Sequence, residues 1–286
     1  MREEAYIDQA HRILLILLTE FDRVCKKYKV QYYLICGSLL GAVRHRSFIP
    51  WDDDVDVAMT REEFNKFCRI AAKEWKGSDF AFVNYNQVGR GAFLDYMSRV
   101  IYLKEEIPVN VFNKIRGKGR RDLDRHMPMD IYVLDKAPKD QKKFDRMVKI
   151  IQGLYGLGMG HRAYINYSEY ENTKPEMQKI IRRLTVIGKW IPLWMIELSY
   201  EIVRTWYRRL KEYDYFQSNG WILCIPMRFK REWFAEGANV EINGNYFAAP
   251  KMYHEYLQFF YGDYMKLPPE EKRKPTHSVD ATGIFH

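Results

Sequence analysis

The chain has 286 residues, of which 47% are hydrophobic and 29% charged, and its formal net charge is +9. This is the composition of a globular protein, long enough for one large domain or for a core with an elaborate insertion. The positive charge suits phosphate-rich partners, but we expect no nucleic-acid partner because the chain has no recognition-helix or zinc-finger pattern.

Apolar spacing at the start of the chain predicts one amphipathic helix from about residue 3 to 28. The segment QYYLIC is typical of a short buried strand, and the helix that follows it is expected to begin with Ser38 as its N-cap. The pair Thr60 and Glu63 forms a capping box that opens a helix reaching about Lys76. Further strands are predicted at DVDVAM, FAFVNY, FLDYMSRVIYL and PMDIYVLD.

The second half is predicted to be mostly helical. Residues 139–214 have a helical pattern almost throughout, and later Asn243-Gly244 predicts a type I′ hairpin before a helix around 251–261. We therefore expect an α+β fold with a mixed sheet and a large helical insertion. The expected segments are a catalytic core (1–138), a helical insertion or lobe (139–214) and a C-terminal α/β segment that packs back on the core (215–286).

The segment Leu184–Val203 is apolar but contains charges, so it falls short of the roughly 18 uncharged residues of a membrane span. One interpretation is a pair of core helices bent at Pro192. The other is an interfacial segment with Trp190 and Trp194 at the level of lipid headgroups. In that case anionic lipid would contact the flanking arginines Arg182, Arg183, Arg204, Arg208 and Arg209.

The cysteine pattern favours a cytoplasmic location. The four cysteines lie far apart without a CxxC pair, so we expect buried thiols in a reducing compartment. The first twelve residues, MREEAYIDQAHR, are too acidic and polar for a signal peptide. Contact with the inner face of the membrane, if any, would then be peripheral.

Four carboxylates lie within five residues of the segment WDDDVDV, at Asp52, Asp53, Asp54 and Asp56. Like charges this close raise one another's pKa unless a cation lies between them. On a strand, alternate side chains share one face and lie about 7 Å apart at Cα, so Asp52, Asp54 and Asp56 can converge on one or two Mg²⁺ ions. Mn²⁺ is a second candidate, and Asp53 points the other way.

Three other interpretations compete for this cluster. An EF-hand loop beginning at Asp52 would end at Glu63, but Val57 stands where its sharp turn needs glycine. A solvated acidic turn would leave the density of charge unexplained. The DxD of a metal-dependent glycosyltransferase, which binds a nucleotide-sugar through a cation, is the alternative that we keep.

The surrounding residues favour phosphoryl or nucleotidyl transfer. Gly37 and Ser38 lie at a strand-to-helix turn, where free N–H groups can face a phosphate. A strand, a Gly-Ser turn, a helix and a strand with DxD form the arrangement of polymerase-beta-like nucleotidyltransferases, which also need a carboxylate on a later strand. Asp130, between Met129 and Ile131, is our candidate for that carboxylate as metal ligand or base, and Asp135 is its rival.

Two groups of basic residues are further candidates for phosphate binding. Arg44, His45 and Arg46, just before the acidic segment, can hold diphosphate oxygens or balance the aspartates. The loop 114–125 is either a solvated loop or a clamp for phosphate or anionic lipid.

The segment CGSLLGAVRHRSFIPWDDDVDVAM resembles the signature of the LicD family, G-[ST]-L-L-G-A-x-R-H-x-G-F-I-P-W-D-D-D-[IV]-D, with Ser47 in place of a glycine. Residues 256–273, YLQFFYGDYMKLPPEEKR, resemble the closing motif of the same family. The likeness thus brackets most of the chain. Residues 139–214 match no part of it, and we expect substrate choice to lie there.

The resemblance implies a nucleotidyltransferase-like fold and transfer of phosphocholine from CDP-choline to a sugar hydroxyl of teichoic acid or lipopolysaccharide, which can be lipid-linked. Relatives of the fukutin group imply other CDP-alcohols as donors. Carried over, Asp54 and Asp56 would bind metal, with Asp52 as an additional ligand and Asp130 as the third carboxylate. A choline group would need an aromatic cage, for which the candidates are Trp51, Tyr253, Tyr256, Tyr261 and Tyr264.

Overall fold

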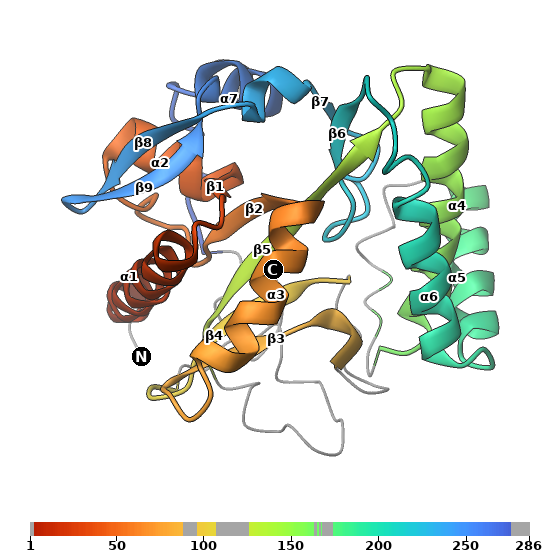
Figure 1. The fold of residues 1–286 in the computed structure, drawn as a ribbon, viewed down its shortest axis with the longest axis horizontal. Coiled ribbons are helices and arrows are strands. Elements are labelled where there is room, and N and C mark those ends of the chain that lie inside the picture. The colour runs from red at the N-terminus through yellow and green to blue at the C-terminus, as the bar shows by residue number, and fades with distance from the viewer. Residues whose placement is uncertain are drawn as a thin grey trace.

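The protein is built on a mixed β-sheet around one long strand (Figure 1). The structure is a computed structural model, described here over residues 3–87, 96–106, 126–162, 165, 167 and 174–275. The strands are β1 (Tyr33–Leu34), β2 (Asp56–Thr60), β3 (Phe80–Val83), β4 (Ser98–Tyr102), β5 (Pro128–Ala137), β6 (Asp214–Gln217), β7 (Arg228–Phe229), β8 (Gly237–Ile242) and β9 (Asn245–Pro250). The helices are α1 (Glu3–Tyr28), α2 (Cys36–His45), α3 (Arg61–Glu74), α4 (Gln141–Met159), α5 (Pro175–Gly188), α6 (Leu193–Arg204) and α7 (Tyr253–Tyr261). The α+β class and the mixed sheet predicted above are confirmed.

The central strand β5 pairs with three others. On one edge it lies parallel to β2, with Val57 opposite Ile131. Its other edge is shared, because β4 pairs antiparallel with its first residues and β6 pairs antiparallel with its last ones. The strands β1, β3 and β7 extend this seven-stranded sheet, and β8 and β9 form a separate hairpin. The candidate active site described below lies at the start of β2 and of β5.

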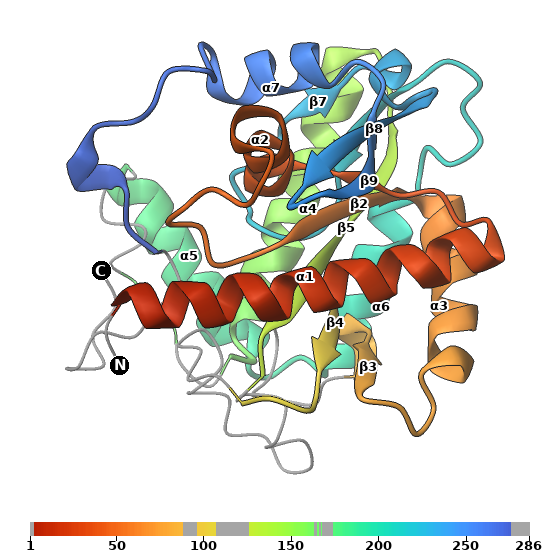
Figure 2. The same ribbon diagram turned by 90° about the vertical axis from the view of Figure 1, so that its left-hand side faces the viewer.

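Two helices cover the sheet with apolar side chains. Along α1, side chains three or four residues apart are fully buried, among them Leu14, Leu17 and Phe21. Phe21 packs against Phe67 of α3, with ring centroids 5.1 Å apart. Figure 2 shows α1 along one side of the molecule, with α2, α7 and the β8–β9 hairpin gathered above it.

The helices α4, α5 and α6 form a lobe on the far side of the sheet from α1 (Figure 1). Both α5 and α6 pack on α4. The contact with α5 is very close, since a Cβ atom at Gly188 would lie 1.9 Å from the carbonyl oxygen of Leu157. After the lobe, β6 returns to the sheet beside β5. The three-segment division of the chain stays a prediction.

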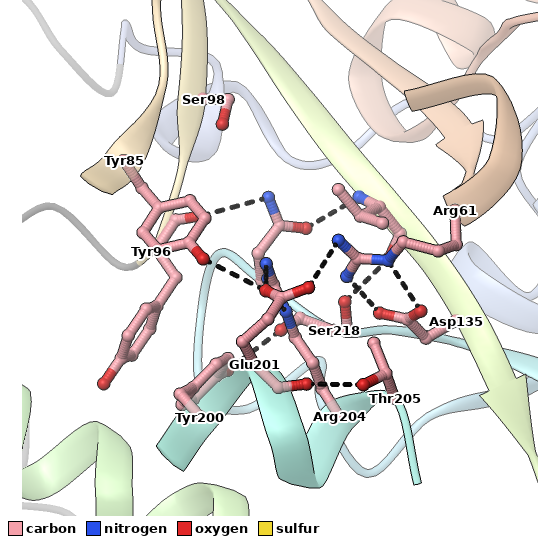
Figure 3. A network of polar contacts seen from close by, with 12 residues as sticks. Arg61, Tyr85, Tyr96, Ser98, Asp135, Tyr200, Glu201, Arg204, Thr205 and Ser218 are labelled. Carbon is pink, nitrogen blue, oxygen red and sulfur yellow. Dashed lines mark hydrogen bonds and ion pairs between the residues drawn. The ribbon is translucent and has the colours of Figure 1, made fainter. Parts of the chain in front are cut away.

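A buried polar network joins this lobe to the sheet (Figure 3). Arg61, the first residue of α3, donates from Nε to Asp135 of β5 at 2.9 Å and from Nη1 to Glu201 of α6 at 3.2 Å. Glu201 also accepts from Tyr85 at 3.0 Å and from Nε of Arg204 at 2.7 Å. Breaking a buried ion pair of this kind typically costs about 3–5 kcal/mol, so the network fixes the lobe against the sheet.

Most local predictions are confirmed, with shifts at the element ends. The first helix spans Glu3–Tyr28, Asn243 and Gly244 both have positive φ as a type I′ turn requires, and the helical segment breaks at Pro192. Thr60 caps α3 by accepting from the Glu63 backbone at 3.4 Å, but the Glu63 carboxylate bonds Gln31, so the capping box is only half formed.

The expectation about Ser38 is wrong. Ser38 is not an N-cap, because α2 begins at Cys36 with Ile35 in the cap position. The preceding strand already turns into helix there, and Ser38 bonds the next strand instead. The helix pair around Pro192 fits the core interpretation on its inner side only: Ile196, Tyr200 and Val203 of α6 are buried, whereas the outer faces of α5 and α6 are exposed.

Glu197 of α6 gives a test of the lobe by pH. Its Oε1 atom is buried without a hydrogen-bond partner among the described residues, and burial raises the pKa of this carboxyl to about 7. A raised folded-state pKa adds stability at low pH that is lost as the pH rises from the unfolded value of about 4.3 through the folded value. We expect Glu197→Gln to raise the melting temperature relative to wild type at about pH 8 but not at about pH 4.

Thermal unfolding at both pH values measures this difference, with Glu212→Gln as a control at an exposed position. If the gain of Glu197→Gln were the same at both pH values, the carboxyl would not titrate as described.

Candidate active site

Two carboxylates lie side by side where β2 meets β5. Asp56, the first residue of β2, is the register partner of Asp130. The Asp130 backbone N–H donates to Val55 at 3.0 Å, which fixes this end of the pairing. Adjacent strands are about 4.8 Å apart, and both side chains leave the sheet on the same face. Asp56 is 8% exposed, so this pairing brings negative charges together out of water.

A negative charge on Asp56 is destabilised by burial and by the neighbouring carboxylates. Burial raises the pKa of its carboxyl well above the ordinary value, and the nearby charges of Asp54, Asp130 and Asp52 raise it further, while Arg99 acts against them. The converging carboxylates are those that the strand pattern predicted. They form a place where a cation would be strongly stabilising.

The first turn of α2 approaches the acidic segment closely. A Cβ atom at position 37 would lie 2.3 Å from Oδ2 of Asp52, so any larger residue would displace that carboxylate. Ser38 Oγ accepts from the Asp56 backbone N–H at 2.8 Å and thereby holds the start of β2. Gly37 and Ser38 therefore position two aspartates, and their role toward phosphate stays a prediction.

Asp53 has a role that the sequence did not reveal. Its carboxylate accepts a hydrogen bond at 3.0 Å from the Tyr6 hydroxyl of α1, and the residue is 3% exposed. Of the four aspartates of this segment, only Asp56 lies in a strand, but the side chains still alternate in direction. Asp52, Asp54 and Asp56 line one cavity, and Asp53 points away from it. Asp53 thus anchors the acidic segment to the first helix.

The cavity beside these carboxylates has a volume of about 880 Å³. Its walls come from α2 and the acidic segment on one side and from residues 261–274 on the other, so the two family-like motifs face each other. The remaining polar and aromatic residues that line it are Cys36, Arg44, Trp51, Trp221, Tyr261, Asp263, Tyr264, Lys266, Lys272 and Lys274.

Arg44 and Trp51 line the cavity and His45 contacts both of them, while the expected binding of substrate by these residues stays a prediction. Arg44 donates from Nη1 to the Tyr264 backbone and from Nε to Nε2 of His45, both at 3.0 Å. Burial, followed by the Arg44 charge, lowers the pKa of His45, in keeping with a neutral acceptor. His45 is not among the lining residues; it packs edge-on against Trp51 with centroids 6.3 Å apart.

The sequence assigned no individual roles to Lys266 and Lys272 of the closing motif, to Lys274 just after it, or to Trp221. It named Tyr261 and Tyr264 as candidates for a cage, and both line the cavity. Tyr253 does not, and Tyr256 is fully buried. Burial and the nearby Cys36 and aspartates raise the pKa of Tyr261, so its hydroxyl stays protonated beside the carboxylates.

Asp130 and its rival Asp135 have different surroundings. Arg99 of β4 donates to Asp130 from Nε at 2.7 Å and from Nη2 at 3.3 Å. Asp135 lies in the buried network of Figure 3, bound to Arg61, which makes it a structural residue. Of these two aspartates, Asp130 is therefore the one that lies beside Asp56. The basic loop 114–125 lies outside the described residues.

Among the described residues, no three carboxylate, imidazole or thiol side chains are already arranged to hold a metal ion. The donor set nevertheless fits a hard cation, because Asp54 and Asp56 line the cavity and a cation would relieve the repulsion at Asp56. Mg²⁺ is usually held by one or two carboxylates together with substrate phosphates. An EF-hand is excluded, since β2 occupies Asp56–Thr60 and Glu63 bonds Gln31.

The repulsion at Asp56 can be measured without any substrate. We expect Asp56→Asn to raise the melting temperature by at least about 2 °C in EDTA at about pH 7.5, because it removes a buried charge among like charges. The gain should vanish at low pH, where Asp56 is protonated. Asp53→Ala, which leaves the Tyr6 hydroxyl without its acceptor, should instead lower the melting temperature. A lower melting temperature for Asp56→Asn would contradict the converging carboxylates.

The comparisons with known proteins agree with this site. Residues 29–115, which include the acidic segment, match the family model described as "LicD/FKTN/FKRP, nucleotidyltransferase domain". The chain is 30% identical to the lipopolysaccharide cholinephosphotransferase LicD of Haemophilus influenzae over 94% of its own length and 95% of that protein. Uncharacterized proteins of Rickettsia typhi and Rickettsia prowazekii are 37% and 38% identical over 19% and 16% of the chain, and the match covers 18% of each.

The match to the Haemophilus protein extends over 280 residues. It therefore includes both the acidic segment and the closing motif, which line opposite sides of the cavity. The family model adds the strand–helix–strand unit that carries Asp54 and Asp56. Together they show that the chain belongs to the LicD family of phosphotransferases.

Proposed function

We propose that this enzyme transfers phosphocholine, or a related phospho-alcohol, from a CDP-linked donor to a sugar hydroxyl of a cell-surface glycan and releases CMP. One observation carries the proposal: a single cavity is lined by four aspartates, several cationic side chains and four aromatic rings. The aromatic rings are those of Trp51, Trp221, Tyr261 and Tyr264.

Two parts of a CDP-choline donor, the diphosphate and the trimethylammonium group, have matching side chains in this cavity. Arg44 and the lysines of residues 266–274 can bind diphosphate oxygens, Arg44 with two donors at once. A trimethylammonium group is attracted to the faces of aromatic rings, which contribute about 0.5–2 kcal/mol each according to their exposure. The ring of Trp51 already has the guanidinium of Arg273 at 5.7 Å, so it can accept a cation.

The acceptor part of the proposal rests on the Haemophilus relative, whose name specifies lipopolysaccharide. Teichoic acid is the other glycan that the family resemblance suggests. The nucleotidyltransferase-like fold is also part of the proposal. It is supported by the description of the matching family model and by the placement of Asp130 on the strand next to Asp56.

The proposed reaction is an attack by the acceptor hydroxyl oxygen on the phosphorus distal to cytidine. A new oxygen–phosphorus bond forms, the bond from that phosphorus to the bridging oxygen breaks, and CMP leaves with the electron pair. Asp130, held by Arg99, is our candidate for the base that takes the hydroxyl proton. The lysines and Arg44 would hold the phosphate oxygens while the charge moves.

Asp54 and Asp56 would hold Mg²⁺ or Mn²⁺, with Asp52 as an additional ligand and Asp130 as the third carboxylate. When bound, such an ion neutralises the diphosphate and makes CMP a better leaving group. We place the reaction in the cytoplasm, in keeping with four cysteines that are free thiols.

The first test is release of CMP from CDP-choline with a lipopolysaccharide or teichoic acid acceptor. We expect turnover that needs Mg²⁺ and falls by at least about a thousandfold in Asp54→Asn, because the ligand to the ion is lost. Unchanged turnover in Asp54→Asn would contradict the assignment. CDP-ribitol and nucleotide-sugars serve as competing donors; transfer from a nucleotide-sugar alone would establish the glycosyltransferase alternative instead.

The second test uses glycine. Gly37→Ala places a methyl group against the Asp52 carboxylate, so we expect turnover to fall by at least about tenfold as the acidic segment shifts. Gly153→Ala is the matched control, since nothing lies within 4 Å of the added atom in the middle of α4. The control should keep full turnover and gain about 0.5–1 kcal/mol of stability. Equal turnover in the two variants would show that Gly37 has no role in positioning Asp52.

A further inference from the structure

The helix α6 is apolar on both of its faces. Its inner face packs Ile196, Tyr200 and Val203 into the lobe, where they are buried. Its outer face presents large apolar side chains to solvent, and these are Trp194, Met195, Leu198 and Ile202. A helix with large apolar side chains on two opposite faces is normally covered on both. Within the described residues nothing covers the outer face of α6.

Large apolar side chains are exposed in the turn before α6 and on α5 as well. Trp190, in the turn between the helices, is 86% exposed, the largest exposed fraction among the large apolar side chains described. The exposed side chains of α5 are Met177, Ile180, Val186 and Ile187. Single apolar residues at a surface are ordinary, but so many on two successive helices and their turn indicate a site of interaction. We call the exposed apolar side chains of 177–202 the outer face of the lobe.

The turn that carries Trp190 is held rigidly. His161 at the end of α4 hydrogen-bonds the Ile191 carbonyl through Nε2 at 2.9 Å. The close approach of α4 and α5 at Gly160 and Gly188 leaves no room for a side chain. The exposed tryptophans are therefore presented by a fixed frame.

Positive charge borders this outer face. Arg182, Arg183, Arg208 and Arg209 are all exposed beside it. Of the arginines that the sequence suggested, Arg204 is excluded, because it is 1% exposed and bound to Glu201 in the network of Figure 3. Glu197 and Glu201 lie on the side of α6 that faces the protein, with one buried oxygen and a buried ion pair respectively. Glu176 in the first turn of α5 is an exposed carboxylate, so the surroundings of the outer face are apolar and mainly cationic.

We propose that α5 and α6 dock in the plane of an anionic lipid bilayer, with the outer face of the lobe in the headgroup region. Tryptophans at the headgroup level, apolar side chains below them and arginines on anionic lipid are the features of an interfacial helix. None of the helices in the described part of the chain is long and apolar enough to cross a membrane. A second copy of the chain fits less well, since two-fold pairing of this surface would bring its arginines against one another.

None of the residues that line the cavity comes from α5 or α6. The inference therefore does not depend on the proposed reaction, and binding can be tested apart from turnover.

The experiment is co-sedimentation of the full chain with vesicles of phosphatidylcholine containing about 30% phosphatidylglycerol. We expect wild type to bind these vesicles and Trp190→Ser/Trp194→Ser to bind at least about tenfold more weakly. Tyr246→Ser removes from the β8–β9 hairpin an aromatic ring about as exposed as that of Trp194 and should bind as wild type does. Melting temperatures of all variants should stay within a few degrees of wild type, because the altered side chains are exposed.

A charge-reversed pair tests the electrostatic part. Arg182→Glu/Arg183→Glu should weaken binding by more than about tenfold, whereas Lys142→Glu/Lys143→Glu, an equal change of charge at the opposite end of α4, should have a smaller effect. Binding of wild type to phosphatidylcholine vesicles without phosphatidylglycerol should be weaker by a similar factor.

Three results would overturn the proposal. The first is no binding of wild type to the anionic vesicles. The second is equal loss in Tyr246→Ser and in the tryptophan variant. The third is a concentration-dependent dimer in sedimentation equilibrium that the tryptophan variant abolishes, since the outer face would then bind a second copy.

Discussion

The parallel pairing of β2 with β5 is the constraint on which the site depends. It places Asp56 opposite Asp130 at the first residue of β2, and burial there makes each added negative charge costly. Three features hold the carboxylates in place despite this cost. The Ser38 hydroxyl accepts from the Asp56 backbone, Gly37 has no side chain that would displace Asp52, and Arg99 donates to Asp130. Buried like charges of this kind are typical of functional sites, where stability is given up for chemistry.

The local parts of this arrangement were predictable from the sequence, because short-range patterns determine them. The spacing of apolar residues predicted α1, Asn-Gly predicted the β8–β9 hairpin, and alternation predicted that Asp52, Asp54 and Asp56 would face one way. Asp130 could be proposed as their partner because an isolated carboxylate between Met129 and Ile131 needs an explanation.

The long-range parts were not predictable, since no local pattern encodes them. The bond from Tyr6 to Asp53 spans 47 residues and explains the aspartate that alternation left over. The closing motif was recognised by resemblance, but the sequence did not show that Lys272 and Tyr261 face Asp54 across a cavity. Ser38 was misjudged because helix α2 begins two residues earlier, at Cys36, whose backbone has a positive φ of 49°.

The same protein thus presents two surfaces of different chemistry, an acidic, cationic and aromatic cavity and an apolar outer face bordered by arginines. In the cavity, we propose that Asp54 and Asp56 bind the donor through a divalent cation. Isothermal titration of the wild-type chain with CDP-choline tests it most directly. The account predicts binding in Mg²⁺ and none in EDTA; equal affinity in Mg²⁺ and in EDTA would contradict it.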